Sequence, residues 1–124
     1  MFAFSILKLQ LPDNDIWRSN LLNKSIDLLL STEYKNLLEN NKYAFTYNPP
    51  GFEIPYSLYV LKKIKEEKLI EISQFWINKQ FNKCFNEESF MMDRNTTDFM
   101  THTARIYELT RLPDNILKEI LINY

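Results

Sequence analysis

Apolar positions recur at helical spacing over most of this chain. Trp17, Leu21 and Leu28 share one face of a predicted helix that starts near Asp13. Ser31 or Thr32 then offers a side-chain oxygen that can cap a second helix. The remaining helix boundaries are predicted at Asn40-Asn41 (a stop), at Asn95 or Thr96 (a start) and after Leu112-Pro113 (a start).

The longest apolar pattern lies between residues 56 and 85. Leu58, Leu61 and Ile64 form a stripe that later apolar residues continue, and no turn residue interrupts positions 62 to 77. We therefore predict one helix from 56 to 85. The alternative is a break near Lys68, followed by a strand at residues 69–72.

In two short segments, side chains on the same face recur at every second residue, as in a β-strand. Residues 2–10 place Phe2 and Phe4 on one side, and residues 43–47 place three aromatic side chains on one face. We expect these two segments to pair as a minor two-stranded element in a mainly α fold.

The composition is that of one small folded unit. Hydrophobic residues make up 45% of the 124 residues and aromatic residues 15%, so the chain can bury a core. No repeat, low-complexity run or Gly/Ser linker divides it, and the clearest break is the Asn48-Pro49-Pro50-Gly51 turn. We expect a single domain over residues 1–124.

Many kinds of site are excluded by what the chain lacks. It contains one glycine, one histidine and one cysteine. A phosphate loop, a dinucleotide fingerprint and a zinc cluster each need several of these residues, so we expect no cofactor and no metal.

The charge and the apolar runs predict location and partners. The formal net charge is −1, which argues against a nucleic-acid partner. The apolar N-terminus has no basic residue ahead of it, and no stretch approaches the roughly 20 apolar residues of a membrane span. The sequence predicts a cytoplasmic protein that is not held in a membrane.

His102 is the one candidate general base near neutral pH. Asp98 precedes it by four residues and can lie on the same helix face. The histidine is either a catalytic or pH-sensing group or a partly buried packing residue. Arg94-Asn95 followed by His102 resembles the motif of HEPN-type helical ribonucleases, which implies that Arg94 and His102 act on a scissile phosphate.

Residues 57–73 carry a second resemblance. A lysine-rich run including Lys62 and Lys63 precedes the apolar residues 69–72. This order resembles the recognition helix and first wing strand of winged-helix proteins, which implies DNA binding. The alternative is a solvated helix face with Glu–Lys pairing.

Cys84 lies beside Lys83 and near Lys79. Neighbouring lysines can lower the pKa of a thiol and make it reactive. The alternative is a small apolar side chain that fills the core.

Aromatic side chains concentrate around the Pro-Pro-Gly turn. Aromatic residues are enriched at protein interfaces, so we predict Tyr47, Phe52, Tyr56 and Tyr59 as partner-binding anchors. With no enzyme motif beside them, the sequence favours a non-enzymatic protein that binds a protein partner. The predicted class is a small cytoplasmic inhibitor or immunity-type protein.

Overall fold

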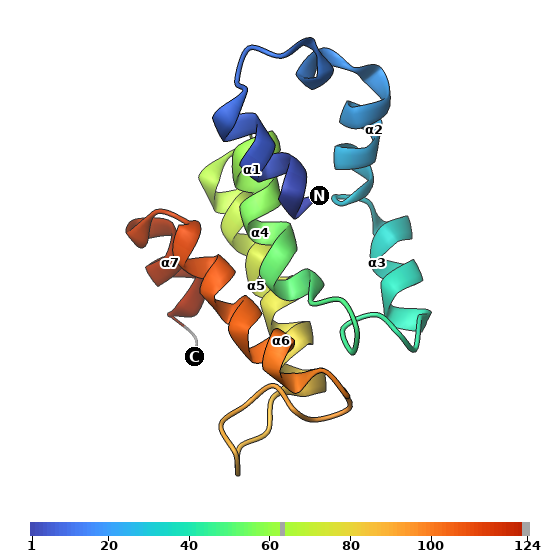
Figure 1. The fold of residues 1–124 in the computed structure, drawn as a ribbon, viewed down its shortest axis with the longest axis vertical. Helices are drawn as coiled ribbons and strands as arrows, with labels where there is room; N and C mark the ends of the chain where they lie inside the picture. The colour runs from blue at the N-terminus through green and yellow to red at the C-terminus, as the bar shows by residue number, and fades with distance from the viewer. Residues whose placement is uncertain (63, 123–124) are drawn as a thin grey trace.

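The fold is mainly helical, as the sequence predicts. A computed structural model describes residues 1–62 and 64–122 (Figure 1). Within them the elements are α1 (Phe2–Gln10), η1 (Asp15–Arg18), α2 (Asn20–Leu28), α3 (Thr32–Asn40), α4 (Pro50–Leu61), α5 (Glu66–Cys84), α6 (Phe99–Arg105), η2 (Ile106–Arg111) and α7 (Asp114–Leu121), where η denotes a 3-10 helix.

An antiparallel pair of helices, α4 and α5, forms the centre of the fold (Figure 1). Helix α1 packs on α4, and η2 and α7 pack against the same pair from another side. The fully buried side chains of Phe52, Leu58, Trp76 and Ile77 come from these two helices. The pair therefore supplies much of the core on which the other helices rest.

The predicted single helix from 56 to 85 is wrong. Helix α4 ends at Leu61, Lys62 has extended backbone angles, and α5 begins at Glu66. Reversing the chain here lets the apolar faces of the two helices bury each other, which a straight helix would leave exposed. The alternative strand at residues 69–72 is also wrong, because those residues lie inside α5.

The predicted two-stranded element is wrong as well. Residues 2–10 form helix α1, in which Ser5 is buried and Phe2 packs against Tyr56 of α4 with ring centroids 5.6 Å apart. Residues 43–47 form a turn, and an isolated bridge joins Ala44 to Asn48 just beyond them. The alternation at residues 2–10 also has apolar residues at helical spacing, and packing on α4 selects the helix.

Several helix ends follow the predicted capping chemistry. The Ser31 side chain accepts a hydrogen bond from the Tyr34 amide at 3.1 Å, and α3 ends with Asn41 as its C-cap. Helix α7 begins directly after Pro113. Helix α6 begins at Phe99 with Asp98 as its cap, later than the predicted Asn95 or Thr96.

Gly51 lies at a close approach of α4 to α5. A Cβ atom at this position would lie 2.5 Å from the Gln80 Cβ and 2.6 Å from the Trp76 carbonyl oxygen. The second contact is with backbone, which a side-chain rotation cannot relieve. The single glycine of the chain therefore sets the spacing of the central helix pair.

We predict that Gly51→Ala destabilises the protein. The added methyl group forces α4 and α5 apart, and overpacking of this kind costs about 1–3 kcal/mol, which outweighs alanine's better helix propensity of about 1 kcal/mol. Urea unfolding followed by circular dichroism measures the change. Ser25→Ala on the exposed face of α2 is the control, and an unchanged midpoint for Gly51→Ala would contradict the close approach.

Candidate functional site

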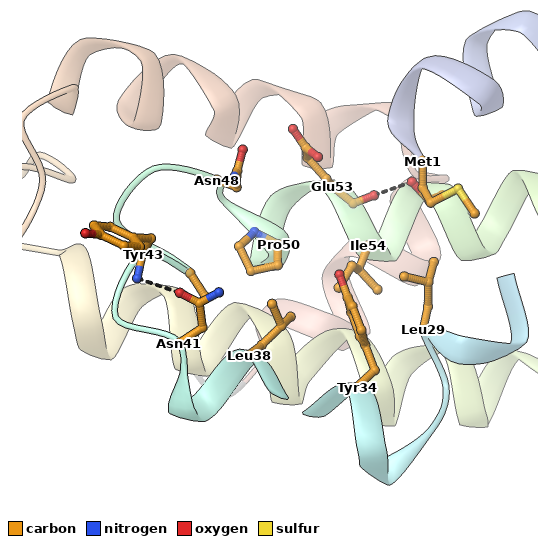
Figure 2. A pocket seen from close by; sticks show the side chains of 12 residues that line it. Met1, Leu29, Tyr34, Leu38, Asn41, Tyr43, Asn48, Pro50, Glu53 and Ile54 are labelled. Atoms are coloured by element: carbon orange, nitrogen blue, oxygen red, sulfur yellow. Dashed lines mark hydrogen bonds between the residues drawn. The ribbon is translucent and has the colours of Figure 1, made fainter. Parts of the chain in front are cut away.

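A partly enclosed pocket of about 280 Å³ lies between α3, the segment 41–50 and α4 (Figure 2). Tyr34 and Leu38 from α3 face Pro50 and Ile54 from α4 across it. The pocket is lined by Met1, Leu29, Tyr34, Leu38, Asn41, Tyr43, Ala44, Asn48, Pro50, Glu53, Ile54 and Ser57.

Polar groups stand at the edge of this apolar pocket. Burial, reinforced by the negative charge of Glu53, raises the pKa of the Tyr34 hydroxyl. The Glu53 carboxylate lies 3.3 Å from an Arg105 guanidinium nitrogen. Among the described residues no side-chain hydrogen bond uses the Tyr34 hydroxyl or the Asn48 amide, so both can serve a ligand.

One wall of the pocket is the turn of residues 41–49, and a buried carbonyl holds it in place. Phe45 has a positive φ of 65° and is fully buried. Its carbonyl oxygen accepts hydrogen bonds from Gln80 Nε2 at 2.9 Å and from Cys84 Sγ at 3.3 Å. The Nε2 atom of His102 lies 2.8 Å from the same oxygen. Groups from α5 and α6 thus meet at a single atom of the turn.

His102 has the contacts of a structural histidine. It is fully buried, and its Nδ1 lies 3.1 Å from the Asp98 carbonyl oxygen. Both ring nitrogens therefore face backbone carbonyls. In this position the imidazole does not reach a surface where RNA would bind.

Arg94, which follows α5 in the chain, folds back onto the C-terminal end of that helix. Its guanidinium donates to the Asn82 carbonyl, and its backbone amide donates to the Cys84 carbonyl at 2.9 Å. Asn95 Nδ2 donates to the Lys83 carbonyl at 2.9 Å. These bonds satisfy the last carbonyls of the helix. The structure does not unite Arg94 and His102 in an exposed catalytic pair.

The four predicted aromatic anchors separate into two groups. Tyr47 and Tyr59 are 56% and 43% exposed, so both are available to a partner. Phe52 is fully buried and Tyr56 is 4% exposed, because both lie on the face of α4 that packs into the core. As surface anchors, Phe52 and Tyr56 are therefore wrong.

The segment that resembles a winged helix has no wing strand in its described residues 57–62 and 64–73. Its apolar residues Leu69 and Ile72 are buried on α5. Lys62 is ion-paired with Asp27 of α2, and Lys63 lies outside the described residues. DNA binding by residues 57–73 stays a prediction. The resemblance to winged-helix proteins on which it rests needs a strand at residues 69–72, and those residues are helical.

The sequence reasoning missed the pocket. Tyr34, Asn48 and Glu53 come from α3, the turn and α4, and no motif joins them. Asn48, at the end of the turn that precedes α4, was the one local signal, since turns commonly place polar groups at surfaces.

None of the helices in residues 1–62 and 64–122 combines the length and apolar composition needed to cross a bilayer. In the same residues no three His, Cys, Asp or Glu side chains gather in the way a metal ion would need.

Comparison with known proteins gives one informative similarity. The chain is 34% identical over 116 residues to archaeal glycosylation protein Q from Haloferax volcanii. The matched region covers 92% of this chain and 30% of that protein, so the chain spans less than a third of its relative's length. No family model matches the chain, and no solved structure matches it.

We predict that Cys84 makes the protein less stable in alkali. Burial raises the pKa of the thiol above its ordinary value of 9.0. An unfolded thiol ionises first, so the stabilisation is complete below about pH 9 and is lost as pH rises through the folded pKa. Urea unfolding at a series of pH values from about 7 to 10 measures this loss.

Cys84→Ala should flatten the alkaline part of the profile even if it lowers stability at every pH. Tyr34→Phe serves as a control, because the raised pKa of that phenol acts at higher pH, above its ordinary 10.0. An alkaline slope that is the same in Cys84→Ala and the unsubstituted protein would overturn the assignment.

Proposed function

We propose that this chain acts in glycosylation and binds a saccharide in the pocket between α3 and α4. The observation that carries the proposal is the similarity to archaeal glycosylation protein Q. It extends over 92% of this chain at 34% identity. Glycosylation attaches saccharides, so a protein of this kind needs a place for a sugar ring.

The chemistry of the pocket supports this proposal. Apolar side chains of Leu38, Pro50 and Ile54 can face the C–H surface of a sugar ring. The Tyr34 hydroxyl and the Asn48 amide can exchange hydrogen bonds with ring hydroxyls. Ligand pockets commonly have this composition, an apolar wall with a few placed polar groups.

The size of the pocket supports a small ligand. Its volume of about 280 Å³ is near the lower end of ligand pockets, which span about 300–1,000 Å³. A single sugar unit suits this space better than an extended chain.

We expect a monosaccharide to perturb the pocket in a nuclear magnetic resonance titration of the ¹⁵N-labelled chain with glucose, galactose, mannose and N-acetylglucosamine. Tyr34→Phe, which removes one hydroxyl, should weaken binding by about 2- to 10-fold. Ile54→Trp fills the pocket and should abolish binding.

Tyr107→Phe is the matched control for Tyr34→Phe, because Tyr107 is 67% exposed on η2 and outside the pocket. It should bind like the unsubstituted chain. Failure of all four sugars to shift pocket resonances, or binding that survives Ile54→Trp, would overturn the proposal.

Binding of a protein partner is a second candidate function. Exposed apolar side chains favour it, since Leu9, Leu11 and Leu21 on the first two helices and the segment between them are 61%, 50% and 78% exposed. Large exposed apolar side chains are common where a protein partner binds. Under this proposal the inhibitor or immunity-type role keeps Tyr47 and Tyr59 as its anchors.

Tyr47→Ala and Tyr59→Ala should each weaken capture of a stoichiometric partner from a lysate of the source cells, because truncating an aromatic hot spot commonly costs about 2 kcal/mol or more. Helicity measured by circular dichroism should not change. Tyr107→Ala is the exposed aromatic control. Equal capture by all three variants would exclude these two side chains as anchors.

A further inference from the structure

A basic cleft lies on the other side of the 41–49 turn. It is formed by the turn itself, the C-terminal end of α5 and the start of the segment that follows Asp93. The lining residues are Lys42, Tyr43, Thr46, Tyr47, Asn82, Lys83, Arg94 and Asn95.

Three cations line this cleft. They are Lys42, Lys83 and Arg94, and among the described residues no Asp or Glu lines the cleft. No ion pair within the described part of the chain involves any of the three. The chain as a whole has a net charge of −1, so the residues outside the cleft together carry a net negative charge.

The nearby carboxylate is already occupied. Glu39 forms an ion pair of 2.6 Å with Lys79. Lys79, and more weakly Lys83, lower the pKa of the Glu39 carboxyl. Glu39 therefore offsets part of the charge of Lys83, whereas Lys42 and Arg94 keep their positive charge available to a ligand.

Hydrogen bonds and ring contacts hold the cleft in shape. The Thr96 hydroxyl donates to the Thr46 carbonyl at 2.6 Å and joins the two walls. The Lys42 ammonium lies 4.7 Å from the centroid of the Tyr43 ring, and the Lys83 ammonium lies 5.0 Å from that of Phe45. The cations are therefore positioned by contacts that need no ligand, which lowers the entropic cost of binding.

The guanidinium of Arg94 retains most of its donors. One of its five N–H groups is engaged by the Asn82 carbonyl. The others can form the paired hydrogen bonds with which arginine recognises phosphate, and the two lysines add point charges.

Aromatic and amide groups complete the cleft. Tyr43 and Tyr47 pack edge to face with centroids 5.6 Å apart and are 53% and 56% exposed. Asn82 also lines the cleft. An aromatic face and an amide suit a sugar ring attached to the anion.

We propose that this cleft binds the phosphate group of a small sugar phosphate. The saccharide part of this inference rests on the proposed function, whereas the phosphate part follows from the three cations. Tyr43 lines both the pocket and the cleft, so the two sites lie on either side of one residue.

Calorimetric titration of the full chain with glucose 1-phosphate, glucose and inorganic phosphate at low salt tests the proposal. Glucose 1-phosphate should bind at least about tenfold more tightly than glucose, which is the gain expected of one charge-assisted hydrogen bond. Its affinity should fall as salt is added.

The Lys42→Gln/Lys83→Gln double variant should weaken glucose 1-phosphate binding by about tenfold or more. The matched control is Lys24→Gln/Lys118→Gln, which removes the same charge from exposed positions outside the cleft and should leave affinity within about twofold. Arg94→Lys keeps the charge but loses the paired geometry, and should weaken binding severalfold without lowering helicity.

The experiments distinguish failure of the saccharide pocket from failure of the phosphate-binding cleft. Phosphate binding that persists in Ile54→Trp while glucose never binds would overturn the saccharide pocket and keep the basic cleft. Equal affinity for glucose and glucose 1-phosphate, or equal losses in the two double-lysine variants, would overturn the cleft. Tighter binding of a single-stranded RNA oligonucleotide through the same lysines would replace the sugar phosphate with nucleic acid as the ligand.

Discussion

The carbonyl oxygen of Phe45 is the point on which the arrangement of this protein depends. Gln80 and Cys84 from α5 donate to it, and His102 from α6 lies at hydrogen-bond distance from it. A buried carbonyl without partners would be costly, and here its partners come from two different helices. The turn that this atom belongs to forms one wall of the pocket and one wall of the basic cleft. Both candidate sites are therefore positioned by the same contact.

The second constraint is the spacing of α4 and α5. The backbone of Gly51 approaches the Trp76 carbonyl so closely that a methyl group does not fit. Because α1, η2 and α7 all pack on this pair, a change in its spacing moves most of the helices. The single glycine thus serves the packing of two helices. A glycine is more often expected in a flexible turn.

The helical class and several helix ends were readable in the sequence because they depend on local chemistry. The Ser31 cap and the start of α7 after Pro113 are examples. The reversal after Leu61 was not readable, since it depends on two apolar faces burying each other across the chain. The same reason separates Tyr47 from Phe52. Their sequence surroundings are alike, and only packing determines that one is exposed and the other buried. The pocket and the cleft are lined by segments that lie far apart in the sequence. The spacing of apolar residues does not predict that such segments come together.

The fastening of the turn at Phe45 also bears on the dynamics of the molecule. Surface turns commonly open by local fluctuation and exchange their amide protons long before the helices do. This turn must release contacts with both α5 and α6 before its buried residue can leave the core. We therefore expect the buried part of the turn to open together with the central helices, so that contacts within the protein hold the wall shared by the two candidate sites.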